Sequence, residues 1–311
     1  MQNLGTGLSA TPITKARLTA LVTASTLVQG ASYWITDERT YVVAIATNQY
    51  VYVRQQARAN VTLYVATTGS DANDGLTVGT PFLTLQKAWN VLSTMDLGVF
   101  TGTIQVANGT YTTGILAASA PVGGTGITIL GNAATPTSVV VSTAADGFYF
   151  SCNASCAITI KGFSIGTSGA SKAGVRVDGH ATIIATYISC AGMSGGGSAG
   201  FYHAEGAGAK IFVSTWQSIM GNIPCYVCAT GGAITFYAIT VAIAAGVAVS
   251  WGFAVSTYVG GILISGVTFS GTATGPRYRV AMNSFILTSS SDPAYLPGSV
   301  VGIAATGGQY A

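Results

Sequence analysis

Two acidic residues stand out in a chain that otherwise carries few charged side chains. Asp178 and Glu205 each precede a glycine, and the interval between them equals the interval from Gly147 to Gly174. In a parallel solenoid with a repeat of that length, they stack on one flank, about 4.8 Å apart at the backbone. Two carboxyl groups about 5 Å apart suit a retaining glycosidase, one as the nucleophile and the other as the acid. The spacing therefore predicts Asp178 and Glu205 as a candidate catalytic pair.

The same two residues have a second interpretation. Asp-Gly and Glu-Gly are ordinary turn dipeptides, and a one-residue shift in register moves a side chain to the opposite face. The segment from Gly200 to Glu205 is one residue longer than the segment from Gly174 to Asp178, so aligning the acids requires a bulge. A sugar-contacting or solvated turn is therefore the alternative to catalysis.

Several side chains near these acids could contact a carbohydrate, because aromatic surfaces stack on sugar rings and charged groups hydrogen-bond to hydroxyls. The candidates are Arg176, His180, Tyr202, His203 and Trp216. The two histidines together with the two acids match no known spacing of metal ligands. Neither a metal centre nor a cofactor is expected.

Two other motifs favour structural roles. Cys225 and Cys228 form a Cys-x-x-Cys without a second such pair, so buried thiols are expected, with zinc or a disulfide as the alternative. Asp71, Asn73 and Asp74 resemble a calcium loop superficially, but two of them are adjacent and no Glu follows. Because calcium loops space their ligands and end in a bidentate Glu, we expect a structural turn there.

The chain from about residue 103 to 290 repeats loosely, which indicates the elements that position these side chains. Gly147, Gly174 and Gly200 begin similar segments at nearly equal intervals. Each unit holds two or three short apolar strands separated by glycine. A period of about 25 residues predicts one coil of a right-handed parallel β-helix per unit. No long helical pattern intervenes, so the expected class is all-β.

The composition agrees with a solenoid. Only 7% of residues are charged, the mean hydropathy is +0.52, and no charged residue or histidine occurs from 211 to 276. Residues 233–255 have the length of a membrane helix. They are, however, interrupted by Thr and Gly and lack flanking basic clusters, so membrane insertion is not expected. The low charge favours an oligomer with extensive contacts.

The basic charge lies at the N-terminus. Residues 1–60 carry five basic and two acidic side chains, a net of +3, whereas the remainder carries seven of each. The repeats therefore have no basic excess with which to bind nucleic acid. The first apolar segment, about 18–28, is interrupted by polar residues, so no signal peptide is expected. A helix over 14–29 ending at Gly30, then strands over 33–36, 41–46 and 50–54 with a turn at 37–39, is predicted.

A second helix is predicted just before the repeats. Leu85, Ala88, Leu92 and Met95 lie on one helical face, and Thr84 is a suitable N-cap. A one-sided helix at this place can cover the open end of a solenoid, whose backbone groups would otherwise lack partners. The turn-rich loop 69–75 precedes it.

Residues 63–92 resemble the entry motif of the pectate-lyase-like parallel β-helix, in the form common in bacteriophage tailspikes. The matching features are a strand, Gly69-Ser-Asp-x-x-x-Gly-Leu76 and Thr80-Pro-Phe-x-Thr-Leu-Gln-x-Ala88. Residues 27–37 resemble N-terminal modules that attach phage tail fibres to the virion. The resemblance implies a homotrimer in the virion tail. In such proteins, acids that cleave host polysaccharide lie on the β-helix flank or between subunits.

The sequence thus predicts three parts: an attachment module at 1–60, a capped β-helix at 61–290 and an extended tail at 291–311. Residues 1–60 are expected to bind a phage tail, baseplate or adaptor protein, and the β-helix a glycan of the host surface. The expected function is structural or receptor-binding. The alternatives are a polysaccharide depolymerase using Asp178 and Glu205, and a bacterial surface adhesin.

Overall fold

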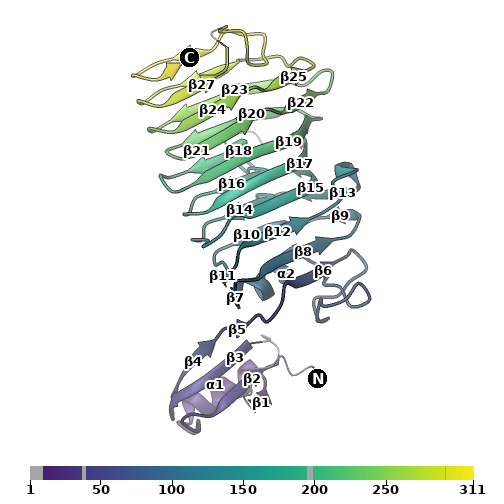
Figure 1. Cartoon of the computed structure of the whole chain (residues 1–311), viewed down its shortest axis with the longest axis vertical. Helices are drawn as coiled ribbons and strands as arrows, with labels where there is room; N and C mark the ends of the chain where they lie inside the picture. Colours follow the sequence, from purple (N-terminus) through teal and green to yellow (C-terminus); the bar gives the residue numbers. More distant parts are fainter. Residues whose placement is uncertain (1–9, 37–39, 195–198, 291) are drawn as a thin grey trace.

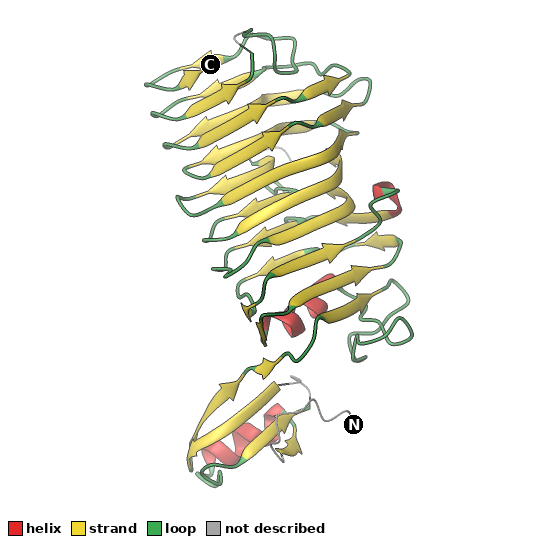
Figure 2. Cartoon of the chain, viewed as in Figure 1, coloured by secondary structure: helices red, strands yellow, loops and turns green. Residues whose placement is uncertain are grey.

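The computed structural model describes residues 10–36, 40–194, 199–290 and 292–311. These residues form a parallel β-solenoid of about 11 turns, preceded by a small module of one helix and several strands (Figure 1). Strands account for 50% of the structure and helices for 7% (Figure 2). The predicted all-β class, a parallel β-helix with a capping helix and a small N-terminal module, is confirmed.

Two long sheets form the solenoid, and every strand pair in them is parallel. The eight-stranded sheet contains β10 (Ile115–Ala117), β14 (Phe148–Phe150), β16 (Val175–Val177), β18 (Gly200–Glu205), β20 (Ile223–Thr230), β23 (Val249–Thr257), β26 (Tyr278–Val280) and β28 (Ile303–Ala304). The fourteen-stranded sheet contains β6 (Val61–Val65), β8 (Thr101–Val106), β9 (Gly109–Tyr111), β12 (Gly126–Leu130), β13 (Val139–Thr143), β15 (Ile158–Thr167), β17 (Thr182–Met193), β19 (Lys210–Ile219), β21 (Ala233–Tyr237), β22 (Thr240–Ile243), β24 (Gly261–Ser265), β25 (Thr268–Ser270), β27 (Phe285–Thr288) and β29 (Gln309–Tyr310). A 3₁₀ turn, Pro136–Ser138, precedes β13.

One inward position is occupied by isoleucine on seven successive strands of the large sheet. The register aligns Ile127, Ile158, Ile183, Ile211, Ile234, Ile262 and Ile286. Each is at most 1% exposed. Burying one isoleucine side chain stabilises a fold by about 1.5–3 kcal/mol, and β-branched residues suit strands. These seven residues are named the isoleucine column, and all of them belong to the buried core of the solenoid.

Helix α2 (Leu85–Ser93) covers the N-terminal end of this core. Leu85, Ala88 and Leu92 are buried as predicted, and Thr84 caps the helix by accepting a hydrogen bond from the Lys87 amide. Trp89 is also buried and donates its indole N–H to the Ser119 carbonyl at 3.0 Å. Met95 does not belong to the helix, because it begins β7 (Met95–Gly98), which pairs with β5 (Gln55–Gln56) and β11 (Val122–Gly123).

Asp71 fixes the loop that enters this helix. Its Oδ1 accepts hydrogen bonds from the amides of Leu83 and Thr84 at 3.0 and 2.9 Å, and its Oδ2 accepts from the Thr84 hydroxyl at 2.8 Å. Asp74 likewise accepts from the Leu76 amide and the Thr80 hydroxyl. Both carboxylates therefore organise a turn, which is the interpretation favoured over a calcium loop.

The N-terminal module has a core of its own, centred on Leu18, Tyr33 and Ile35. It contains β1 (Ala10–Ile13), α1 (Lys15–Thr23), β2 (Ser32–Ile35), β3 (Thr40–Ala46) and β4 (Gln49–Val53), with the strands in one sheet in that order. The helix is shorter than predicted. It stops at Thr23, because Ser25 adopts a left-handed backbone with φ +52°. The turn predicted at 37–39 lies outside the described residues.

Arg54 joins this module to the solenoid. Its Nη1 donates to the carbonyl oxygens of Ser93, Met95 and Ala120 at 2.7, 3.4 and 3.3 Å. The first two carbonyls lie at the end of α2, where unpaired carbonyls favour a cation. One side chain therefore satisfies the end of the capping helix and holds the linker against the first coil.

The C-terminal residues differ from the extended tail that the sequence predicts. β28 pairs with β26 and β29 with β27, both in parallel. Tyr310 stacks on Tyr278 with ring centroids 3.9 Å apart. Residues 292–311 thus continue the solenoid as a further partial turn.

The apolar stretch 233–255 forms β21, β22 and part of β23. No helix in the described part of the chain is long and apolar enough to cross a membrane.

Replacing Asp71 by alanine is expected to lower the free energy of unfolding by about 2 kcal/mol, because a charged acceptor with three donors is lost. Asp71→Asn keeps one carbonyl oxygen and should lose about half as much. Urea denaturation measures the change, and amide hydrogen exchange at Leu83 and Thr84 localises it. Equal stability of Asp71→Ala and the unaltered protein would contradict this role.

Candidate functional site

The register places the two predicted acids on adjacent coils. Val177 of β16 is opposite Ala204 of β18, so Asp178 and Glu205, which follow directly, neighbour each other. These strands pair in constant register without a bulge. The extra residue that the glycine alignment indicated lies before the paired segment, because Gly174 precedes Val175, which is opposite Tyr202.

Arg176 connects both acids. Its Nε lies 2.9 Å from Asp178 Oδ1, and its Nη2 lies 2.7 Å from Glu205 Oε2. Tyr149, on the preceding coil, donates its hydroxyl to Asp178 Oδ2 at 2.6 Å, and the Arg176 guanidinium lies 5.0 Å from the centre of the Tyr149 ring. The side chains of Arg176 and Asp178 are each 22% exposed and that of Glu205 is 44% exposed. The four residues form a half-buried ionic cluster at the surface.

This cluster belongs to a row of side chains on the outer face of the eight-stranded sheet. Phe148, Val175 and Val177 point into the main core, so the residues that alternate with them point outward. This line is named the outer row; the register aligns Tyr149, Arg176, His203, Cys228, Val255 and Arg279 in it. Asp178, Glu205 and Thr230 lie beside the row, two residues further along the chain than Arg176, His203 and Cys228.

The middle of the outer row is buried. His203 is 8% exposed and Cys228 is 3% exposed. Thr230 Oγ1 lies 3.4 Å from His203 Nε2 and 3.8 Å from Cys228 Sγ. Burial lowers the pKa of His203, but the hydrogen bond and charge of Cys228 outweigh it and raise this pKa. Hydrogen bonding to Cys225 and His203 holds the pKa of Cys228 well below its ordinary value, against the effect of burial.

Tyr202 was predicted as a carbohydrate contact, and that prediction is wrong. Its side chain is fully buried in the main core. The hydroxyl donates to Gln217 Oε1 at 2.6 Å, and the ring makes an edge contact with Tyr226, with centroids 5.5 Å apart. Aligning Gly174 with Gly200 places Tyr202 beside the outward Arg176. The true register is shifted by one residue and pairs Tyr202 with the inward Val175.

The remaining two predicted contacts lie elsewhere. His180 is exposed in the turn after β16, where its backbone amide donates to Asn153 Oδ1 at 3.2 Å. Trp216 lies on β19 of the other sheet and is 39% exposed. Thr215 beside it adopts φ +62° and accepts a hydrogen bond from the Tyr187 amide. Trp216 therefore belongs to a corner of the solenoid with Tyr187, separate from the outer row.

Tyr149 is the member of the cluster that is absent from the candidate site residues predicted from the sequence. A usable signal existed, because Tyr149, Arg176 and His203 follow one another at the same interval that separates Asp178 from Glu205. Such an exact repeat of the spacing between the two acids indicates that the three side chains share one row.

The geometry of the cluster engages both carboxylates with one guanidinium. A retaining glycosidase uses one of its acids as a nucleophile and the other as a proton donor, and both must reach the substrate. Arg176 occupies an oxygen of each acid, whereas paired charges and an aromatic ring at the surface suit hydrogen bonding to a bound polar ligand.

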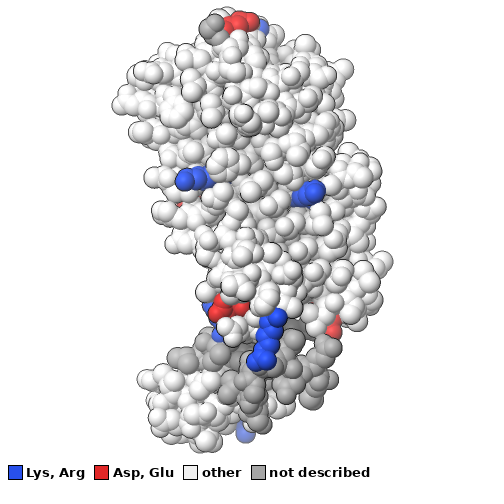
Figure 3. Space-filling model, viewed as in Figure 1, with Lys and Arg blue, Asp and Glu red and all other residues white. Residues whose placement is uncertain are grey.

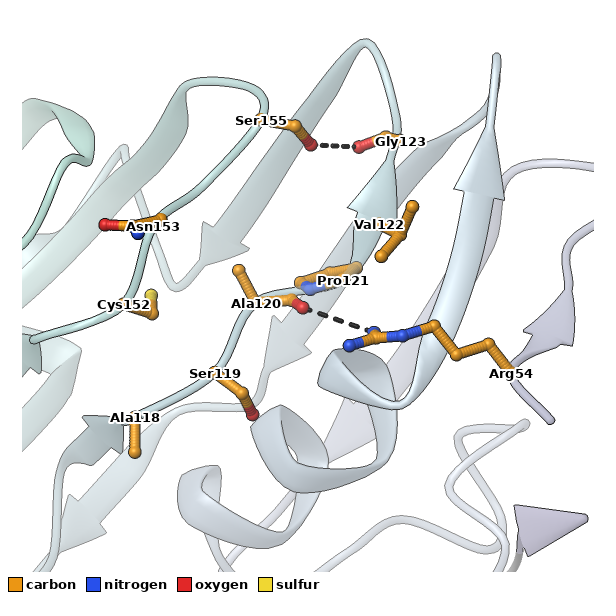
Figure 4. Close-up of a pocket in the computed structure, with 10 residues that line it drawn as sticks. All are labelled: Arg54, Ala118, Ser119, Ala120, Pro121, Val122, Gly123, Cys152, Asn153 and Ser155. Atoms are coloured by element: carbon orange, nitrogen blue, oxygen red, sulfur yellow. Dashed lines mark hydrogen bonds between the residues drawn. The ribbon is translucent and has the colours of Figure 1, made fainter. Parts of the chain in front are cut away.

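A separate hollow of about 330 Å³ lies between Arg54 and the first coils (Figure 4). It is lined by Arg54, residues 118–123, Cys152, Asn153 and Ser155. Figure 4 shows Arg54 turned toward the Ala120 carbonyl and Ser155 toward the Gly123 carbonyl, and both contacts are hydrogen bonds. None of the predicted site residues lines this hollow.

The five cysteines are all reduced, so the disulfide alternative is not realised in this structure. Over the described residues, no three His, Cys, Asp or Glu side chains come together in a way that could hold a metal ion.

Comparison with known proteins adds no relative. No family model matches the chain, and no curated protein and no solved structure is significantly similar to it.

Replacing Tyr149 by phenylalanine tests the cluster through its pH dependence. The hydrogen bond to Asp178, with burial and the Asp178 charge, raises the pKa of Tyr149 from 10.0 to about 12. The hydroxyl therefore stabilises the fold fully below pH 10, and this contribution is lost as pH rises to about 12. Tyr149→Phe should be about 1 kcal/mol less stable at neutral pH, and the difference should shrink above pH 10.

The measurement is urea denaturation of both proteins across this alkaline range. Tyr258→Phe is the matched control, because Tyr258 is 61% exposed and should show no difference at any pH. A Tyr149→Phe difference that stays constant from neutral pH to pH 12 would argue against the Asp178 hydrogen bond.

Proposed function

We propose that this protein is a bacteriophage tail component that supports the tail and binds a polysaccharide of the host surface. The observation that carries the binding proposal is the ionic cluster of Tyr149, Arg176, Asp178 and Glu205, which lies on the flank of a capped β-solenoid. Its donors and acceptors repeat with the coil spacing of about 4.8 Å, which is close to the length of one sugar unit. A chain of sugars lying along the solenoid axis meets a polar group on each of the three coils that supply the cluster.

The entry segment supports the phage assignment. The loop held by Asp71 leads into a helix that caps a parallel β-solenoid, and its sequence resembles the tailspike entry motif. The module at 1–60 is proposed to dock on a tail, baseplate or adaptor protein. The proposal puts the protein in the virion, with the solenoid directed at the host.

A trimer is part of the proposal, and the solenoid surface offers a contact face. On the outside of the large sheet the register aligns Ile184, Phe212, Thr235, Leu263 and Leu287. Phe212 is 42% exposed and Leu287 is 45% exposed. Figure 3 shows charged side chains at only a few places on the face in view. An apolar column on a surface this poor in charge favours burial against other subunits.

A depolymerase is the second candidate, because the two carboxylates are one coil apart. Catalysis would require a bound glycan to displace Arg176 from one of them, so that this acid could reach the glycosidic bond. Binding without cleavage requires no such change, and it is the function that we favour.

Light scattering tests the assembly. The full-length protein should have three times the 31.4 kDa mass of the chain, and a variant lacking residues 1–60 should still be a trimer if the solenoid supplies the contacts. Phe212→Glu should shift the mass toward the monomer, because it buries a charge in the interface. A monomeric full-length protein would remove the trimer from the proposal.

Glycan binding and cleavage are measured together on polysaccharides purified from candidate hosts. Asp178→Asn and Glu205→Gln should each weaken binding about tenfold, the effect of losing one charge-assisted hydrogen bond. Asp292→Asn, at the far end of the solenoid, is the matched control and should bind normally. We expect intact polysaccharide throughout.

Release of oligosaccharides by the unaltered protein, abolished in both amide variants, would establish the depolymerase instead. Unchanged binding in both variants would show that the cluster is not the glycan site.

A further inference from the structure

Two thiols form a second apolar cluster on the outside of the solenoid. Cys225, Cys228 and Val255 pack together apart from the main core, with Trp251 against them. Cys225 is fully buried and Cys228 is 3% exposed. The glycan site proposed above makes no use of either sulfur.

The strand brings these thiols to one side although they are three residues apart. Residues at i and i+3 of a straight strand point to opposite faces. Here Tyr226 and Val227 both belong to the main core, so β20 bends between them and the flanking side chains converge outside. The thiol of Cys225 hydrogen-bonds to Cys228, and its sulfur also lies 3.0 Å from the Val227 carbonyl oxygen. The two sulfurs are in contact without a covalent bond.

His203 is a further side chain beside the two thiols. It lies opposite Cys228 on the neighbouring strand, and with 8% of its surface exposed it is more than nine-tenths buried. Its Nδ1 is buried without a hydrogen-bond partner. A buried polar atom without a partner is costly in a native structure, and here it adjoins a pair of sulfur ligands.

We propose that Cys225 and Cys228 form a two-thiolate site for a soft monovalent ion, Cu(I), with the His203 ring beside it. Thiolates select Cu(I) over harder ions, and an apolar enclosure that excludes water suits its low coordination number. Zinc requires four ligands, and the described residues offer no group of even three. The small exposed fractions of Cys228 and His203 mark the side from which an ion enters.

The binding step balances. On binding, two S–H bonds are replaced by two Cu–S bonds, both protons leave to solvent, and the copper keeps its oxidation state. The complex of two thiolates and one Cu(I) carries a net charge of −1 and lies beside the polar groups of His203 and Thr230.

The test is an anaerobic competition between the reduced full-length protein and bicinchoninate, a coloured Cu(I) chelator. The unaltered protein should retain one Cu(I) per chain in the presence of bicinchoninate. Cys225→Ala and Cys228→Ala should each weaken binding at least about 100-fold, since even outer-shell changes at metal sites cost about 10- to 100-fold. Cys156→Ala removes a more exposed thiol and is the matched control.

A second measurement works on the unaltered protein and does not depend on the folding of variants. Iodoacetamide reaches the buried Cys225 and Cys228 only when the fold opens, and bound Cu(I) should slow their alkylation further without slowing that of Cys156. Cleavage by chymotrypsin after Tyr226 separates the two cysteines, so that mass spectrometry scores each one by itself.

The proposal is overturned if bicinchoninate removes all the copper from the unaltered protein. It is also overturned if Cys225→Ala binds copper as tightly as the unaltered protein does. Copper that protects Cys156 and leaves Cys225 and Cys228 reactive would overturn it as well.

Discussion

The structure depends on one constraint: the coils stack in parallel register, so that side chains of the same type contact one another on neighbouring coils. The isoleucine column of the large sheet shows this constraint most clearly. Between the two ends of the column, each isoleucine lies between two others with the same branched shape at the same depth. A shift of one residue in any coil would turn that isoleucine out to solvent and break the match with the coils above and below it. The column therefore fixes the register of the strands, and this register also sets the position of every side chain that points outward.

The outer row follows from this register. The core-facing residues Val175 and Ala204 require Arg176, Asp178 and Glu205 to face outward on adjacent coils. No loop is needed to bring the cluster together, and its geometry is as rigid as the strands beneath it. The thiol pair arises where the strand departs from alternation, because the bend at Tyr226 and Val227 turns two cysteines toward each other.

The sequence predicted the solenoid because its periods are visible without coordinates. The recurrence of glycine-initiated units, the one-sided helix with its Thr84 cap and the spacing of Asp178 and Glu205 were sufficient. The orientation of Tyr202 was not predicted, because two alignments of the glycines differed by one residue and only burial distinguishes them. The role of Arg176 as the bridge between both acids depends on side-chain rotamers, which the spacing does not specify. The end of the first helix at Thr23 depended on a left-handed serine, a conformation that has no signature in composition.

The partners of Arg54 have a further consequence. All three acceptors are backbone carbonyls, so the joint between the module and the solenoid is largely independent of which side chains stand at those positions. Substitutions that reshape the outer face of the coils leave the joint intact, provided that the backbone keeps its path. Substitutions can therefore accumulate on the outer face of the coils while the module keeps the same attachment to the solenoid, and the two parts of the molecule are free to diverge at different rates.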